Sequence, residues 1–152
     1  MSSRVLRGRV KARRAAVQAL YQWQLSDQDP RAILGEFVAE REMLHVDQDY
    51  FSTLACEVPA RIAELDEALV GVIDRPVKEL GPVEHAVLLI GVYELKYRPE
   101  VPWRVVINEA VELTKMFGAE QAYKYVNGVL DKVAHRLRAA EIGGMRRHDI
   151  GV

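Results

Sequence analysis

The alternation of apolar and polar positions along the chain is typical of a helical protein. Across residues 86–95 every side chain except those of Gly91 and Glu94 is apolar or aromatic. A helix that is hydrophobic on nearly all sides must be surrounded by other elements. Pro82 suits a first helical turn and Pro99 lies beyond the end of the run. We therefore predict a central buried helix, although its length is too short for a membrane span of about 20 residues.

Recurrence of apolar residues every three or four positions predicts further helices before and after this run. The expected segments are Arg9–Leu25, a short helix capped by Asp29, a longer one capped by Asp47, one turn over 77–80, and helices over 104–117 and 119–137. Pro59 should kink or break the helix that follows Asp47. We expect Gly128 to allow close packing of the last helix. The fold prediction is all-α, a compact helical domain of about seven helices.

Length and composition indicate an ordinary globular chain. The 152 residues suit one domain with a sizeable core, and 49% of them are hydrophobic while 28% are charged. Cys56 is the single cysteine, so no internal disulfide can form, which fits a reducing compartment. The Arg-rich start also resembles an organellar transit peptide, but it runs directly into Leu20 and Trp23, which look like core residues. We expect a cytoplasmic protein with no membrane segment.

Charge is unevenly distributed along the chain. The first 26 residues contain six basic and no acidic side chains, whereas the remainder has 15 basic against 22 acidic ones. On a helical wheel Arg7, Lys11 and Arg14 lie opposite the apolar stripe with Tyr21 near them, and Arg13 lies at the border. A basic face that continues into an exposed aromatic ring suits nucleic acid, because stacking supplements attraction to phosphate. A merely solvated terminal run, with Tyr21 at the core edge, is the competing interpretation.

No residue pattern points to catalysis or to a metal. The four histidines, His45, His85, His135 and His148, form no metal-binding spacing with Cys56. There is no Gly-rich phosphate loop and no nucleophile elbow. Glu109 and Glu112 share a helical side and could act as an acid/base pair, but a solvated acidic face is favoured. Cys56 is interpreted as a small core residue. We therefore predict a protein that is not an enzyme and needs no cofactor or metal.

Several stretches resemble the NusB family of bacterial transcription antitermination factors. They are RRAAVQALYQWQ at 13–24, LGPVE at 80–84 with YEL at 93–95, VVINEAVELTK at 105–115, FGAE at 117–120 and YVNGVLDK at 125–132. The resemblance extends from Arg9 to Leu137 in the family's order. It implies two packed helical subdomains within a domain at 9–138, preceded by a basic arm at 1–8 that we expect to be flexible. The residues of the C-terminal segment, with Gly143-Gly144 and Arg146-Arg147, predict a loose tail at 139–152.

The resemblance also implies a function and a set of functional residues. NusB proteins bind single-stranded boxA RNA together with NusE, a small-subunit ribosomal protein, and act in the RNA polymerase antitermination complex, notably on rRNA operons. The residues that match RNA-binding positions are Arg9, Lys11, Arg13, Arg14, Phe117, Lys124 and Tyr125, and those on the NusE side are Tyr21 and Glu84. The basic arm is longer than usual and interleaved with Val10 and Ala12, so the resemblance assigns no role to Arg4 or Arg7.

Two other protein classes share parts of this pattern. A NusB-like domain precedes some rRNA methyltransferases, but that class needs a C-terminal catalytic domain, and we expect this chain to end before one. A pure oligomerisation module would differ by binding no RNA. Some relatives form homodimers that hide the arginine face, and the residues do not distinguish a homodimer from a monomer.

Overall fold

The structure is a computed structural model that describes the backbone of residues 2–149 and the side chains of residues 2–144. Over that range the chain is helical and has no strand, which confirms the all-α prediction. The α-helices are α1 (Ser3–Ser26), α2 (Pro30–Glu40), α3 (Gln48–Ala60), α4 (Ile62–Val70), α5 (Pro82–Tyr97), α6 (Trp103–Phe117), α7 (Ala122–Leu137) and α8 (Ala139–Asp149), with a 3-10 turn, η1 (Val77–Glu79), before α5.

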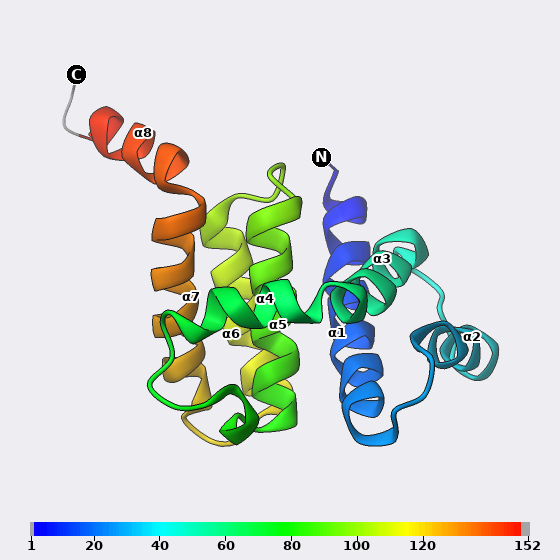
Figure 1. Cartoon of the computed structure of the whole chain (residues 1–152). Coiled ribbons are helices and arrows are strands. Elements are labelled where there is room, and N and C mark those ends of the chain that lie inside the picture. The colour runs from blue at the N-terminus through cyan, green and yellow to red at the C-terminus, as the bar shows by residue number, and fades with distance from the viewer. Residues whose placement is uncertain (1, 150–152) are drawn as a thin grey trace.

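The helices form two groups that meet along α5 (Figure 1). Helices α1, α2 and α3 pack together in one group, and α5, α6 and α7 pack together in the other. Helix α4 crosses between the groups in Figure 1, and α5 contacts α1, α4, α6 and α7. No helix between residues 2 and 149 has both the length and the apolar character needed to cross a membrane.

Helix α5 is the buried centre of the molecule, as predicted. Every residue from Ala86 to Leu95 is buried, including Glu94, which is 1% exposed. A Cβ atom on Gly91 would lie 2.7 Å from Leu130 Cδ1, so Gly91 allows α7 to approach α5 closely. We had expected that role for Gly128, and this was wrong, because Gly128 is exposed and a Cβ there would meet no atom within 4 Å.

Local signals for helix ends agree with the structure. The side chains of Asp29 and Asp47 accept hydrogen bonds from the backbone N–H groups of Arg31 (2.8 Å) and Tyr50 (3.0 Å), and so cap α2 and α3. Pro59 lies in the last turn of α3, and the helix breaks just after it, since α4 begins at Ile62. Both caps and the break were predicted.

The structure of the N-terminal basic segment differs from the prediction. Residues 1–8 were expected to be flexible, but α1 already begins at Ser3. Its N-cap is Ser2, whose hydroxyl accepts a hydrogen bond from Val5 N (3.2 Å). Gly8 would weaken a free helix, yet here it is buried and its carbonyl accepts a hydrogen bond from Asp47 N (3.1 Å). The basic residues from Arg4 onward are therefore part of α1.

The C-terminal tail is a second correction, because residues 139–149 form α8 and not a loose segment. Residues 150–152 lie outside the described range. Arg138, 8% exposed, donates hydrogen bonds to the carbonyls of Glu94, Leu95, Arg98 and Val101 and to the Glu141 carboxylate. Glu141 also accepts from Trp103 N (3.1 Å), and Ile142 is buried. These contacts anchor the first turn of α8.

Candidate nucleic-acid interface

The outer face of α1 carries a row of cationic side chains. Arg4, Arg7, Lys11 and Arg14 follow one another at intervals of three, four and three residues, which places them on one side of the helix. Arg4, Arg7 and Arg14 are exposed and Lys11 is half-buried. None of the four forms an ion pair with another residue that the structure describes, so their charge faces solvent.

The inner face of the same helix holds Arg13 in the core. Arg13 is 4% exposed, and its Nε and Nη2 atoms donate to the Glu94 carboxylate at 3.1 and 2.8 Å. The Tyr50 hydroxyl donates to the same carboxylate. Burial alone would lower the pKa of Arg13, but Glu94 outweighs it and raises that pKa. Burial and then Glu94 raise the pKa of Tyr50.

Among the predicted RNA-binding residues, Arg13 is the one whose side chain the structure places in the core. Arg13 lies at the border of the apolar stripe of α1, and its side chain points into the core because the Glu94 carboxylate of α5 binds it there. The ion pair with Glu94 and the 4% exposure of Arg13 leave its guanidinium little access to a phosphate outside the protein.

Arg9 lies between the two faces. Its Nη2 atom is 3.3 Å from Glu100 Oε2, its side chain is 13% exposed, and its guanidinium lies 4.4 Å from the centre of the Tyr50 ring. Arg98 also approaches this ring, at 4.9 Å. Arg9 is thus partly committed to intramolecular contacts, and Lys11 and Arg14 are the predicted basic residues that remain available.

Farther along α1 the basic row leads to an apolar groove. A hollow of about 580 Å³ is lined by Tyr21 and Leu25 of α1, Val83 of α5 and Phe117 of α6. Tyr21 is 39% and Leu25 62% exposed. The structure therefore brings Phe117 together with Tyr21, although the resemblance had placed these residues in different roles.

Tyr125 and Lys124 lie elsewhere, at the start of α7. The Tyr125 hydroxyl donates to Asp74 (3.1 Å), and the Arg75 guanidinium covers its ring at 4.5 Å. Hydrogen bonds from Arg75 and then Tyr125 lower the pKa of Asp74. Lys124 is exposed. A base could stack only on the face of Tyr125 that Arg75 leaves open.

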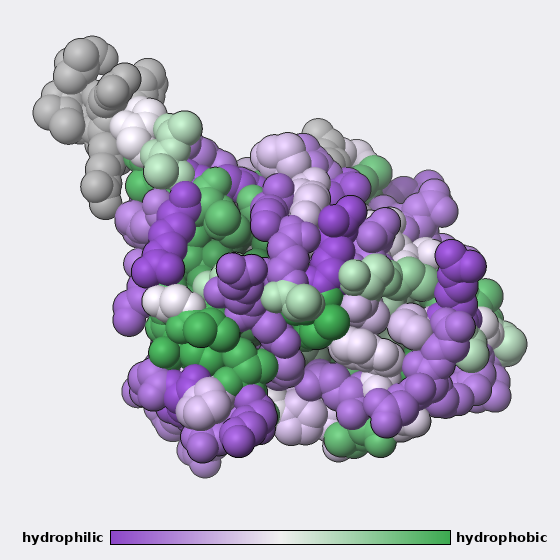
Figure 2. All heavy atoms as spheres, in the orientation of Figure 1, coloured by the Kyte–Doolittle hydropathy of each residue, from purple (hydrophilic) through white to green (hydrophobic). Residues whose placement is uncertain are grey.

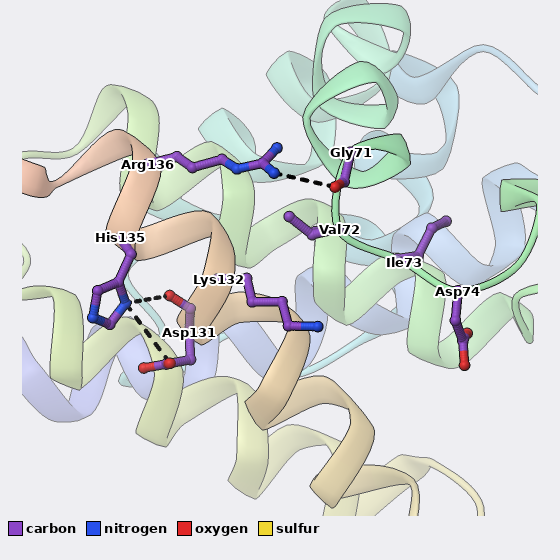
Figure 3. A pocket seen from close by; sticks show the side chains of 8 residues that line it. All are labelled: Gly71, Val72, Ile73, Asp74, Asp131, Lys132, His135 and Arg136. Carbon is purple, nitrogen blue, oxygen red and sulfur yellow. Dashed lines mark hydrogen bonds and ion pairs between the residues drawn. The ribbon is translucent and has the colours of Figure 1, made fainter.

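Asp74 also borders a hollow of about 640 Å³ between α7 and the segment after α4 (Figure 3). Arg136 reaches across it and donates to the Gly71 carbonyl (3.3 Å). Lys132 and Asp131 add opposite charges to its wall. Figure 2 shows hydrophobic patches among hydrophilic residues on this side of the molecule. The mixed charge makes this hollow a weaker anion site than the outer face of α1.

Glu84 lies in the first turn of α5, where a carboxylate is favoured by the partial positive charge of the helix end. Its Oε1 atom accepts a hydrogen bond from Ala119 N (3.2 Å), and so joins α5 to the connection between α6 and α7. Gly118 is close by, with space for no larger side chain. Its neighbour Val83 lines the groove of Tyr21 and Phe117. The two residues predicted on the partner side, Tyr21 and Glu84, therefore lie in one region.

The other residues considered for catalysis or metal binding do not cluster in the part of the chain that the structure describes. Among the described residues no group of three or more His, Cys, Asp or Glu side chains could hold a metal ion. Cys56 is half-buried, and burial raises the pKa of its thiol. Glu112 is exposed and lies 3.7 Å from Lys115 Nζ. Sequence reasoning missed Arg41, which stacks on Phe37 at 4.0 Å and lines the groove of Tyr21, because no local pattern signals that contact.

The fold and this surface define an all-helical protein that presents a rigid basic helix face ending in exposed aromatic and apolar side chains. Comparison with known proteins identifies the family. Residues 10–135 match the NusB family model, and the chain belongs to the NusB family.

Individual relatives agree over nearly the whole chain. It is 54% identical over 133 residues to the transcription antitermination protein NusB of Nitrosococcus oceani, covering 88% of this chain and 89% of that protein. It is 50% identical over 141 residues to NusB of Alcanivorax borkumensis, covering 93% and 94%.

Solved structures have the same fold. A solved structure of T. maritima NusB matches with a TM-score of 0.68 at 28% identity, covering 83% of this chain and 89% of that one. A crystal structure of the antitermination factors NusB and NusE in complex with dsRNA matches with a TM-score of 0.72 at 27% identity, covering 86% and 98%.

Proposed function

We propose that this chain is a transcription antitermination factor that binds RNA together with NusE in the RNA polymerase antitermination complex. The observation that carries the proposal is its similarity, over 86% of its length, to the NusB chain of a complex with NusE and dsRNA. The names of its most similar relatives support the same role. boxA RNA is the expected target, by resemblance to the family.

The outer face of α1 supplies the phosphate contacts in this proposal. Lys11 and Arg14 have no intramolecular ion partner in the described structure, so they are free to neutralise phosphates, while Arg9 contributes in part. Phe117, Lys124 and Tyr125 complete the RNA-binding set. Affinity for single strands arises from phosphate neutralisation and stacking, so binding requires no catalytic group. We accordingly propose a non-enzymatic role in the cytoplasm, where nascent bacterial RNA is made.

Tyr21 and Glu84 mark the proposed NusE side. The body of the chain is acidic by composition, and a ribosomal protein is expected to be basic, so complementary charge should assist docking. A carboxylate does not attract phosphate, and any effect of Glu84 on RNA should therefore pass through NusE. Coupling is reciprocal, so RNA should tighten the protein pair by the factor by which NusE tightens RNA binding.

A calorimetric cycle tests the proposal. Single-stranded and duplex boxA RNA are each titrated into the protein with and without NusE, because the related crystal structure contains dsRNA. We expect NusE to increase boxA affinity, and Glu84→Lys to weaken NusE binding and to weaken RNA binding only when NusE is present. Glu112→Lys, at an exposed carboxylate on α6, is the matched control. Absence of RNA binding under every condition would refute the proposed function.

A further inference from the structure

The loop between α2 and α3, residues 41–47, runs beside the outer face of α1 and is fastened to it at both ends. At one end the Arg41 guanidinium donates to the Gln18 side chain. At the other, Asp47 N donates to the Gly8 carbonyl (3.1 Å). A Cβ on Gly8 would lie 3.4 Å from Asp47 N and Cβ, so the loop rests directly against the helix backbone.

Two hollows lie between this loop and α1. The first, about 670 Å³, is lined by Arg4, Arg7 and Lys11 from the helix and by His45 from the loop. The second, about 470 Å³, is lined by Lys11 and Arg14 from the helix and again by His45. Because the hollows share Lys11 and His45, they form one groove. The second hollow shares Gln18 and Arg41 with the apolar groove of Tyr21, so the three hollows lie next to one another along α1.

The groove is strongly cationic. Its walls carry five Arg and Lys side chains, namely Arg4, Arg7, Lys11, Arg14 and Arg41, against the carboxylates of Glu42 and Asp47. One oxygen of the Asp47 carboxylate also accepts the Tyr50 N–H that caps α3, and the five cations still exceed the two carboxylates by three charges. From Arg4 to Leu25, the part of α1 that the hollows follow extends about 32 Å at 1.5 Å per residue. Such a track is long, positive at one end and aromatic at the other.

We propose that the loop 41–47 is the second wall of an RNA-binding groove and that His45 contacts the phosphate backbone of RNA that lies along α1. This inference rests on the proposed function and adds a residue that the family resemblance did not assign. His45 is exposed and is held with φ 68°, a left-handed conformation that histidine adopts more readily than most residues. His45 lines both hollows together with Lys11, so a phosphate between the walls would lie near side chains of the loop and of the helix.

RNA is the occupant that this chemistry favours. A positively charged groove that follows the backbone and leads to aromatic side chains is the arrangement by which proteins hold single strands. Residues from both walls would neutralise successive phosphates as the strand passes toward Tyr21. A basic protein such as NusE would be repelled by the same five cations.

Charge substitutions at His45 provide the test. His45→Lys adds a cation to the groove, so the log–log salt slope for boxA RNA should steepen by roughly 0.7, or about 2.6-fold more loss of affinity between 50 and 200 mM salt. His45→Glu should weaken binding. Ala63→Lys and Ala63→Glu make matched charge changes at an exposed site on α4, outside the hollows, and should have smaller effects. Fluorescence anisotropy at fixed pH measures each, and thermal melts show that each variant is folded.

A second measurement does not depend on charge. A photo-crosslinking residue replaces Leu44, which is 63% exposed and lines both hollows, or Ala63 as the control. Adducts with labelled RNA at position 44 and none at 63 support the inference. If Lys11→Gln weakens RNA binding while the His45 variants match the Ala63 variants and position 44 gives no adduct, the loop is not a wall of the groove and the proposed function still stands. Changed NusE binding with unchanged RNA binding also overturns the inference. Wild-type protein that binds no RNA overturns both.

Discussion

The inner and outer faces of α1 contain the same kind of residue in opposite circumstances. Arg13 and Arg14 are neighbours in sequence, yet Arg13 is 4% exposed and bound to Glu94, whereas Arg14 is exposed and has no ion partner among the described residues. Arg13 joins the two groups of helices, because α1 belongs to the first group and α5 to the second. Arg14 contributes its positive charge to the protein surface. Arginine content alone therefore does not measure an RNA-binding site, and the 100° step between neighbours decides which role each residue takes.

The largest effect should come from the inner face. Arg13→Ala leaves the Glu94 carboxylate buried without its cation, which should lower the free energy of unfolding by about 3–5 kcal/mol. Arg14→Ala should change it by less than about 0.5 kcal/mol, as is usual for exposed sites. Urea denaturation measures both.

A triple substitution sharpens this prediction. Arg13→Met, Glu94→Leu and Tyr50→Phe together remove every polar partner in the cluster, and replacing a buried ion pair by apolar residues is often neutral or stabilising. The triple variant should therefore be more stable than Arg13→Ala alone. If Arg13→Ala cost no stability but flattened the salt dependence of RNA binding, the division between the two faces would be wrong.

The second-largest effect is expected at Tyr125 of α7, which tests whether an exposed residue outside α1 also acts in RNA binding. Tyr125→Ala should cost roughly 1–3 kcal/mol of RNA affinity if a base stacks on the ring. Tyr125→Phe should cost much less, because it keeps the ring and loses only the hydrogen bond to exposed Asp74. RNA titrations give the affinities. Large destabilisation in a thermal melt with unchanged affinity of the folded protein would make Tyr125 a packing residue.

Substitutions on the outer face of α1 should change the salt dependence of RNA binding more than they change the stability of the protein. Replacing Lys11 and Arg14 together by Gln should flatten the log–log salt slope by up to about 1.4 if each neutralises one phosphate of a single strand. Between 50 and 200 mM salt this amounts to roughly a sevenfold smaller change in affinity. Arg104→Gln, at an exposed position on α6, is the control. An unchanged slope in the double variant would make Lys11 and Arg14 solvated charges.

The smallest effect should be that of Cys56→Ser. The thiol is half-buried and its pKa is raised by burial, so it is a poor nucleophile at neutral pH. RNA binding by the folded variant should equal that of the wild type. A large loss of affinity at equal stability would give the thiol a functional role.

Periodicity predicted the helices well because apolar spacing reports burial directly. The buried run of α5, the caps Asp29 and Asp47 and the break after Pro59 all followed from local chemistry. The side taken by Arg13 could not be read from α1 alone, since it depends on a carboxylate 81 residues away. Glu94 was nevertheless a usable signal, because a lone acid in a buried helix requires a cationic partner.

Features set by tertiary contact were beyond sequence reasoning. Gly91 is buried and approached by Leu130, whereas Gly128 is exposed, and this difference depends on how α7 packs against α5. The start of α1 at Ser3 is different, because the Ser2 cap that sets it is a local feature of the sequence. The closeness of Arg41 to Gln18 depends on how α2 folds back along α1, which no local pattern encodes.

The four backbone hydrogen bonds of Arg138 impose an order of events during synthesis. They close the C-terminal end of α5, yet Arg138 is translated 40 residues after Arg98, one of its acceptors. At about 5–20 residues per second the ribosome needs about 2–8 s to make that interval. Throughout it the carbonyls of Leu95, Arg98 and Val101 lack their Arg138 donor, and the Glu94 carbonyl has only its bond from Arg98 N (3.0 Å), so this end of the central helix is held by fewer hydrogen bonds. The nascent chain therefore completes its core only when its last helices emerge.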